Sequence, residues 1–224
     1  NCGYGVKELY KKFDSSVIKI LKCANCHEIA DKYIEFEPII ILIDIVLLSK
    51  GAYRHVMYNT NFKLHWKLAL VLLLLESFAT WRQKSNKFPF SHVHDMPEKE
   101  FYFCCLENII ENFILFAFLY ALYNFFEVLV RKKFYDTHLP AVNLWKAITI
   151  ANLGKFFLLP IMIWKENTTD LGYKIHYLLI MGYYFVSFVQ VYSVVSHTSK
   201  LRAIFVVLLA LVMKQSAAVY VINY

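Results

Sequence analysis

The sequence predicts an α-helical membrane protein in which four or five transmembrane helices follow a small N-terminal head. Three observations lead to this fold class. The 224 residues are 58% hydrophobic and 18% charged, whereas soluble domains carry about 45–50% apolar and about 25% charged residues. Beyond residue 63 the apolar residues gather in stretches long enough to cross a hydrocarbon core of roughly 30 Å. Residues 1–63 hold nine Lys or Arg and seven Asp or Glu, so we expect a head domain over 1–63 and a transmembrane helical domain over 64–224.

The composition also excludes several classes of protein. Disordered, collagen-like and small disulfide-stapled chains do not have this composition, and five cysteines are an odd number for a disulfide framework. A formal charge of +7 can indicate nucleic-acid binding, but here the Lys and Arg residues are scattered between apolar segments. We expect them to contact anionic headgroups on the cytosolic side, with no nucleic-acid partner. The sequence begins at Asn1 with no Met and no apolar leader, so we expect the natural chain to start further upstream.

Three cysteines in the head match most of a zinc ribbon. Cys2 is followed after twenty residues by Cys23 and Cys26, which fill three of the four positions of a C-x2-C…C-x2-C pattern. Two such turns place four thiolates tetrahedrally around Zn²⁺, and a closed site of this kind stabilises a fold instead of activating water. The partner of Cys2 would be a cysteine three residues before it, just upstream of Asn1. We therefore expect zinc as the cofactor and a zinc-ribbon head built on β-hairpins.

Other interpretations of these cysteines stay open. Residues Cys23 to His27 also spell C-x-x-C-H, the attachment pattern of c-type haem, although no secretory leader precedes it and Cys2 would have no role. His27 could supply a zinc ligand if no cysteine lies upstream, and the hairpin could also hold no metal. The adjacent Cys104 and Cys105, at a membrane entrance, are expected to be packed thiols.

The segment after the cysteines predicts a strand and a short helix. Residues 33–37 alternate between apolar and polar as a half-buried strand does, and Pro38 suits the first turn of a helix. The apolar run 39–48 would reach only about 15 Å as a helix, which is too short to span a bilayer. It is either the core helix of the head or a helix lying in the interface. We expect a surface for a partner or for lipid headgroups beside it, formed by Asp44, Tyr53, Arg54 and His55.

Five apolar stretches are candidate transmembrane spans, and all should be helices because a lone strand or loop leaves backbone groups unpaired in lipid. They cover residues 64–81, 104–130, 141–164, 173–196 and 201–223. The second contains Glu107, Glu111 and Glu127, and the fifth contains Lys214, so either could be tilted, re-entrant or buried behind other helices. We therefore expect four to five spans.

Basic residues near the spans predict the orientation. With the head in the cytosol, the inner connections carry five positive charges and the outer connections carry six, so the connections alone do not set the orientation. Lys50, Arg54, Lys63 and Lys67 lie close to the start of the first span and decide in favour of a cytosolic head. The glycosylation sequon at 167–169 then lies on the lumenal side.

Ionisable residues inside the predicted spans indicate either pairing between helices or a polar path. Glu76 in the first span and Lys155 in the third could pair, since both spans run in the same direction. Glu107 and Glu111 repeat at i, i+4 and form a polar stripe on one face of the second span, and Lys214 in the fifth span could form ion pairs with them. A structural ion pair, a lipid-headgroup or flip pathway, and snorkelling of the side chains to the surface all stay open.

The cysteines are interleaved with several characteristic strings in the head. These are VKELYKKF (6–13), DKYIEFEP (31–38), LIDIVLL (42–48) and AYRHVMYN (52–59). In this order they resemble the homology domain that opens the Arv family, the ACAT-related proteins required for viability. The resemblance is dense over about 1–61 and thins to pieces such as GKFFLLPIMIW (154–164), where that family has a transmembrane helix.

That resemblance implies a multi-pass membrane protein of the endoplasmic reticulum that supports sterol and sphingolipid homeostasis and GPI-anchor biosynthesis. Members of the family are discussed as lipid transporters or flippases for a GPI intermediate, or as accessory subunits of early GPI-synthesising enzymes. The implied partners are membrane lipids (a sterol, a phosphoinositide-type lipid or a GPI precursor) and a GPI-synthesising membrane enzyme complex. The missing first cysteine departs from the family pattern.

We expect no enzymatic activity. The sequence contains no P-loop, G-x-S-x-G, H-E-x-x-H or dinucleotide motif. His65 and His176, the candidates for an acyltransferase-like histidine, lie near predicted span ends, where an amphipathic ring is ordinary. Two functions stay open: an accessory subunit of a GPI-synthesising enzyme, which the small rigid head favours, and a lipid transporter or flippase.

Overall fold

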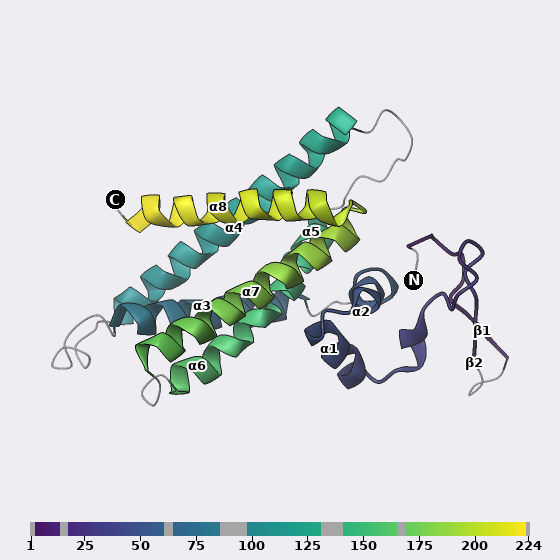
Figure 1. Cartoon of the computed structure of the whole chain (residues 1–224), viewed down its shortest axis with the longest axis horizontal. Coiled ribbons are helices and arrows are strands. Elements are labelled where there is room, and N and C mark those ends of the chain that lie inside the picture. The colour runs from purple at the N-terminus through teal and green to yellow at the C-terminus, as the bar shows by residue number, and fades with distance from the viewer. Residues whose placement is uncertain are drawn as a thin grey trace. The chain divides into compact units, whose positions relative to one another are not determined.

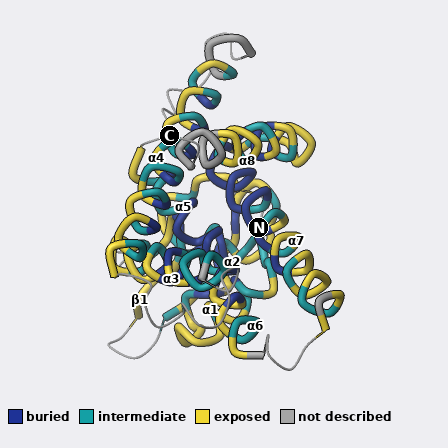
Figure 2. Tube along the Cα trace, turned by 90° about the vertical axis from the view of Figure 1, so that its left-hand side faces the viewer, coloured by how far each residue is buried: buried dark blue, intermediate teal, exposed yellow. Residues whose placement is uncertain are grey.

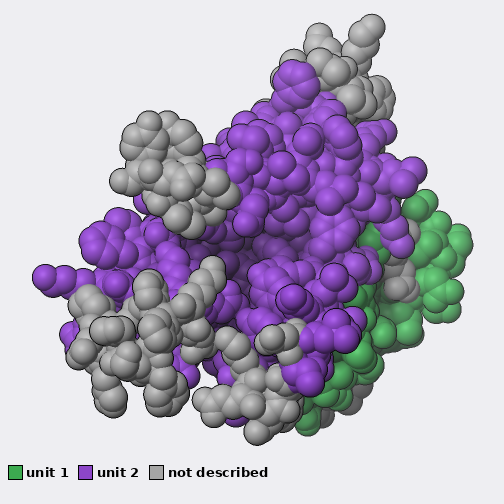
Figure 3. Space-filling model, turned by 60° about the vertical axis from the view of Figure 1, so that its left-hand side comes forward, with its two compact units in different colours: residues 1–62 green, residues 63–224 purple. Residues whose placement is uncertain are grey.

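The computed structural model describes residues 3–13, 18–60, 65–85, 98–130, 141–164 and 169–222. The chain divides into two compact units, residues 1–62 and 63–224 (Figure 3). The first unit holds the polar head and the second holds the apolar helices.

Unit 1 begins with two small β-hairpins. Strands β1 (Tyr10–Lys12) and β2 (Ile18–Ile20) are antiparallel, with Lys11 opposite Lys19. A second antiparallel bridge joins two residues on either side of the C-x-x-C segment. The head therefore contains hairpin structure, as the sequence predicts, in very short pieces.

A 3-10 helix, η1 (Lys32–Glu35), stands where the alternating pattern predicts a strand. Asp31 accepts a hydrogen bond from the Tyr33 N–H at 2.9 Å, and the Phe36 N–H donates to the Tyr33 carbonyl at 3.2 Å. The strand prediction is wrong because these local bonds satisfy the backbone without a partner strand. They also direct Tyr33 into the core of the unit, where it is 2% exposed.

Three short helices complete unit 1: α1 (Pro38–Val46), α2 (Lys50–Arg54) and η2 (His55–Asn59), the last in π-helical geometry. Pro38 begins α1, where its missing N–H would have no partner within the helix. Ile45 of α1 is buried, but other apolar side chains of this helix are exposed, namely Ile39, Ile40, Leu42 and Ile43. An exposed apolar helix of nine residues agrees with the interfacial alternative and not with a fully buried core helix.

Unit 2 consists of helices that begin and end close to the five predicted apolar stretches (Figure 1). They are α3 (His65–Ser85), α4 (Glu98–Val130), α5 (Ala141–Ala151), η4 (Asn152–Phe157), α6 (Leu158–Trp164), α7 (Asp170–Val195) and α8 (Lys200–Ile222). The 3-10 segment η4 joins α5 and α6 without an intervening loop.

Three stretches in the described part of the chain are long and apolar enough to cross a membrane: Glu98–Phe126, Ala141–Ile163 and Leu171–Val195. Helices α3 and α8 are not among them. Polar and charged residues near both ends lower the hydropathy of α3, and the structure describes the side chains of α8 only over residues 200–216. Length and composition thus support a membrane protein with three of the four or five predicted spans.

Side-chain contacts show which helix ends meet. Lys84, at the end of α3, contacts Glu107 near the start of α4, with Nζ and Oε2 2.8 Å apart. Gln83 donates to the hydroxyl of Tyr173, near the start of α7, at 3.2 Å. The starts of α4 and α7 therefore lie at the end of the bundle where α3 finishes. The C-terminal ends of α4 and α7 lie at the opposite end, and α8 begins there.

The buried residues of unit 2 lie on the faces that the helices turn toward one another, as the dark blue segments of Figure 2 show. Helix α4 packs mainly against α3 and α8, and α7 packs against α5 and α8. Leu115 and Leu119 of α4 and Val207 of α8 are fully buried. Leu178 and Leu179 of α7 are exposed and apolar, as expected for side chains that face lipid.

Candidate functional site

The C-x-x-C segment forms a tight turn in unit 1. The Cys23 N–H donates to the Glu28 carbonyl at 2.8 Å, and the His27 N–H donates back to the Cys23 carbonyl at 2.9 Å. Cys23 is buried and Cys26 is partly buried. His27, directly after the second cysteine, has φ of 59°, the left-handed region that favours glycine. This backbone brings both thiols to one turn, an arrangement that suits two ligands of a tetrahedral zinc site.

Cys2, the third predicted ligand, lies outside the described residues. Gly3, directly after it, has φ of 85°. Each predicted pair of ligands is therefore followed by a residue with φ in the left-handed region, a feature that the cysteine spacing alone does not reveal. Within the described ranges, which do not include Cys2, no group of three His, Cys, Asp or Glu side chains could hold a metal ion.

A buried carboxylate connects the segment after the cysteines to the helices of the head. Asp31 accepts from His55 Nδ1 at 2.6 Å, from Asn59 Nδ2 at 2.5 Å and from the Tyr33 N–H. Burial by itself would raise the pKa of Asp31, but the hydrogen bonds from His55, Asn59 and Tyr33 outweigh it and lower the pKa below its ordinary value of 3.8. Asp31 is therefore an ionised, buried acceptor that holds three parts of the head together.

A second polar contact in the head is centred on Tyr33. Its hydroxyl donates to Asp44 Oδ2 at 2.6 Å and lies 3.0 Å from Ser49 Oγ. The ring lies against Gly51, where an added Cβ would be 3.1 Å from Cε2 of Tyr33. Asp44 of α1 therefore contributes to the interior packing of the head.

The surface predicted from Asp44, Tyr53, Arg54 and His55 needs correction. Tyr53 is fully buried and donates to the Ile45 carbonyl at 3.0 Å, and His55 is buried against Asp31. The core of the head therefore contains these polar aromatic side chains, while Ile39, Ile40, Leu42 and Ile43 are exposed. Arg54 is partly exposed, and its guanidinium lies close to Gly3.

Four charged side chains from four helices meet inside unit 2, and we call them the charge cluster: Glu76, Glu111, Lys155 and Lys214. Glu76 of α3 lies 2.6 Å from Lys155 of η4, measured from Oε2 to Nζ. Its other oxygen lies 3.1 Å from Lys214 Nζ of α8, and Glu111 of α4 lies 3.5 Å from the same lysine. The two acids and two bases compensate one another, which lowers the cost of placing charges between apolar helices.

Uncharged polar groups surround this cluster. Asn108 donates to Ser77 Oγ at 3.0 Å, which connects α4 to α3, and Lys155 Nζ lies 5.2 Å from the ring centre of Tyr184. Four buried polar atoms have no hydrogen-bond partner among the described residues: Trp81 Nε1, Asn112 Oδ1, Asn152 Oδ1 and Tyr184 Oη. The interior around the cluster is therefore polar and has unused hydrogen-bonding capacity.

The 3-10 segment η4 positions Lys155. Gly154 lies so close to α7 that an added Cβ would be 2.7 Å from Cδ1 of Tyr183. Because glycine permits this approach, the lysine that follows it is carried between the helices, where it is 6% exposed. A short 3-10 stretch inside a longer helix often marks a strained or functional position.

The predicted polar stripe on α4 divides between two partners. Glu107 pairs with Lys84 near the end of the bundle, and only Glu111 reaches Lys214. Lys214 therefore pairs with only one of the two glutamates of α4, because Glu107 pairs with Lys84, and its amine also contacts Glu76 of α3. His176, considered as a catalytic histidine, lies on an exposed face of α7.

Comparison with known proteins gives one consistent result. The model of the Arv1-like family matches residues 1–188. Protein ARV1 of Mus musculus is 31% identical over 220 residues, which cover 95% of this chain and 79% of the mouse protein. Protein ARV1 of Bos taurus is 34% identical over 178 residues, which cover 76% of this chain and 60% of the bovine protein. The match therefore spans less than two thirds of the bovine relative, and no solved structure matches this chain.

Proposed function

Because this chain belongs to the Arv1-like family, we propose that it is a non-catalytic membrane protein of the endoplasmic reticulum that supports sterol and sphingolipid homeostasis and GPI-anchor biosynthesis. Its role is that of an accessory subunit of an early GPI-synthesising enzyme. The observation that carries this choice is the charge cluster, in which every charged group has an opposite charge within reach.

A cluster in which the charges compensate one another favours a structural role over a route for lipid headgroups between the helices. A lipid headgroup that crosses between helices needs polar groups that can exchange partners, whereas both oxygens of Glu76 are already held by lysines. The four residues come from α3, α4, η4 and α8, so the cluster joins elements that are distant in sequence. A bundle held in this way offers a fixed outer surface, as a subunit that docks onto an enzyme requires.

The same contacts support five transmembrane spans. Helices α3 and α8 have 21 and 23 residues, enough for roughly 30 Å at 1.5 Å per residue. Glu76 and Lys214, the charged residues nearest the middle of each helix, contact each other and not lipid. With five spans and a cytosolic head, α1 would lie in the inner interface with its exposed isoleucines and leucines in the headgroup layer.

Zinc belongs to this proposal as a structural cofactor. Cys23 and Cys26 would bind it together with Cys2 and a cysteine upstream of Asn1, and the left-handed residues after each pair support that arrangement. Bound zinc would supply folding free energy to a head with few buried apolar residues. No proton or electron transfer is assigned to it.

A second candidate function is a lipid transporter or flippase that moves a sterol or a GPI intermediate. The observation in its favour is a set of buried polar atoms in unit 2 that have no hydrogen-bond partner among the described residues, including those of Asn112, Asn152 and Tyr184. A lipid hydroxyl or a water chain would satisfy them.

Reconstitution separates the two functions. The full-length protein is purified and placed in liposomes that contain a fluorescent phospholipid or a GPI precursor, and the transfer between leaflets is measured. The accessory role predicts the same rate as protein-free liposomes, together with co-purification of GPI-synthesising subunits from detergent-solubilised membranes. Faster transfer that Glu76→Gln abolishes would establish the transporter instead.

A further inference from the structure

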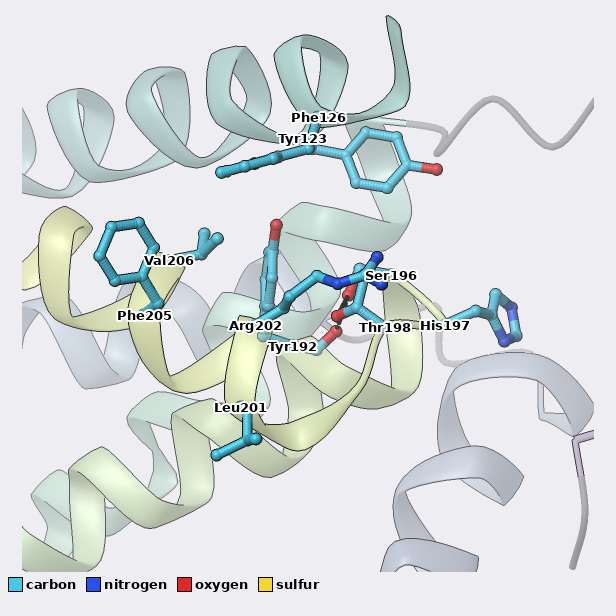
Figure 4. Close-up of a pocket in the computed structure, with 10 residues that line it drawn as sticks. All are labelled: Tyr123, Phe126, Tyr192, Ser196, His197, Thr198, Leu201, Arg202, Phe205 and Val206. Atoms are coloured by element: carbon cyan, nitrogen blue, oxygen red, sulfur yellow. Dashed lines mark hydrogen bonds between the residues drawn. The ribbon is translucent and has the colours of Figure 1, made fainter. Parts of the chain in front are cut away.

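A cavity of about 330 Å³ opens between α4, the turn after α7, and the first turns of α8 (Figure 4). Its volume is at the lower end of ordinary ligand pockets, which range over about 300–1,000 Å³. Tyr123, Tyr192, Ser196 and Val206 form its buried part. The cavity lies at the end of the bundle where α4 and α7 finish, away from the Lys84–Glu107 contact.

The turn that borders this cavity is held by hydroxyl groups. Ser196 Oγ donates to the Tyr192 carbonyl at 2.7 Å and lies 2.8 Å from Thr198 Oγ1. Ser193 Oγ donates to the Thr198 carbonyl at 3.0 Å. These bonds preorganise the wall of the cavity (Figure 4). Because Ser196 donates to the Tyr192 carbonyl, Thr198 is the donor to Ser196 Oγ, and its hydroxyl proton is used within the turn.

One charged side chain lines the cavity. Arg202 is exposed on the first turn of α8 and extends toward Ser196 and Thr198 (Figure 4). It makes no ion pair or hydrogen bond with another described residue, and no Asp or Glu occurs among the lining residues that the structure describes. The start of α8 adds the positive end of a helix dipole. This side of the cavity therefore favours an anion that can accept two hydrogen bonds from a guanidinium.

The opposite rim is apolar. Leu201 is 80% exposed and Phe205 is 56% exposed, and Phe126 of α4 also lines the cavity. At the edge of a membrane, an exposed apolar rim beside a single arginine matches the two chemical parts of an amphiphile.

We propose that this cavity binds an anionic phospholipid, with its phosphate on the Arg202 guanidinium and the upper part of an acyl chain against Phe126 and Phe205. The site is remote from the charge cluster and does not depend on the proposed accessory function. It would give the helical unit a fixed contact with one leaflet.

The test uses the full-length chain in detergent and follows its melting temperature as lipid is added. Dioctanoyl phosphatidic acid should raise it in a saturable way, and dioctanoyl phosphatidylcholine and inorganic phosphate should bind at least about tenfold more weakly. Arg202→Gln should weaken phosphatidic acid binding by about tenfold or more. Lys200→Gln removes another exposed cation, two residues away, that does not line the cavity, and should leave binding unchanged.

Two results would overturn the proposal. Equal binding by the Arg202→Gln and Lys200→Gln variants would show that the lipid is attracted by general positive charge. Inorganic phosphate that binds as tightly as phosphatidic acid would show a free-anion site without a role for the apolar rim. If Arg202→Gln does not fold, Arg202→Lys keeps the charge and should still weaken binding several-fold, because it loses the two-pronged contact.

Discussion

Glu76 and Lys155, 79 positions apart in sequence, meet between the helices of unit 2 with Oε2 and Nζ 2.6 Å apart. The relationship is unequal, because Glu76 also holds Lys214, whereas Lys155 has no second carboxylate among its described contacts. Glu76 is therefore the centre of the charge cluster.

This asymmetry predicts that replacing Glu76 lowers the free energy of unfolding more than replacing Lys155 does. Glu76→Gln leaves Lys155 without a carboxylate and should lower the free energy of unfolding by roughly 3–5 kcal/mol, as for a broken buried pair. Lys155→Met should cost less, since Lys214 still compensates Glu76. Thermal unfolding in detergent measures both variants. Lys84→Met, which breaks the more exposed Lys84–Glu107 pair, is the matched control and should change stability by about 1 kcal/mol at most. Equal losses for Glu76→Gln and Lys84→Met would contradict the central role of Glu76.

The close approach of η4 to α7 predicts a second asymmetry, between two glycines. Gly154→Ala should destabilise the protein by roughly 1–3 kcal/mol, because its Cβ would meet the Tyr183 ring at 2.7 Å. Gly182→Ala is the control, since a Cβ there meets nothing within 4 Å, and it should be neutral or stabilise helix α7 by about 0.5–1 kcal/mol. The melting temperatures of both variants test this. A neutral Gly154→Ala would mean that η4 and α7 are further apart.

The buried carboxylate of the head predicts a pH dependence. Because hydrogen bonds lower the pKa of Asp31 in the folded protein, its contribution to stability is present above its ordinary value of 3.8. That contribution is lost as the pH falls through the lower, folded-state pKa. Resistance of the head to proteolysis by pepsin should therefore fall steeply at the acid end of a pH 5 to pH 2 series. Asp31→Asn should be less resistant at pH 5 and show a flatter profile, whereas Glu35→Gln, at an exposed position, should follow the wild type.

The proposed zinc site predicts that Cys23→Ser unfolds the head, because the metal supplies folding free energy. Elemental analysis of the intact full-length protein should find about one zinc per chain, and the variant should lose it together with protease resistance. Cys105→Ser, on α4, should keep both. A wild-type protein without zinc, or a Cys23→Ser head as resistant as the wild type, would refute the assignment.

His27 discriminates between the structural and the ligand interpretations of the turn. Its φ of 59° costs a non-glycine residue about 1–2 kcal/mol, so His27→Gly should stabilise the head slightly and keep its zinc. His27→Val, which is β-branched, should destabilise it. Zinc content and protease resistance are measured on both variants. Loss of zinc from His27→Gly would instead make the imidazole a ligand.

Much of the local structure could be predicted from the residues alone. The apolar stretches became helices because lipid leaves a backbone no other partner, and Pro38 begins α1 for the same local reason that prolines begin helices elsewhere. The alternation of residues 33–37 gave no reason to doubt a strand there. The 3-10 helix depends on the hydrogen bond from the Tyr33 N–H to Asp31, which a pattern of apolar and polar residues does not show. The burial of Tyr53 and His55 was equally hidden, because it depends on how three short helices enclose them.

The sequence by itself determined that the chain is a membrane protein, where the long apolar helices of unit 2 lie and which family it resembles, since these depend on composition, short-range spacing and local motifs. Only the tertiary structure decided which charges meet. Lys214 lies 138 positions from Glu76, and nothing in the spacing says that it contacts Glu76 as well as Glu111. That choice follows from the crossing of four helices, and a crossing is set by the packing of whole faces, which no local pattern records.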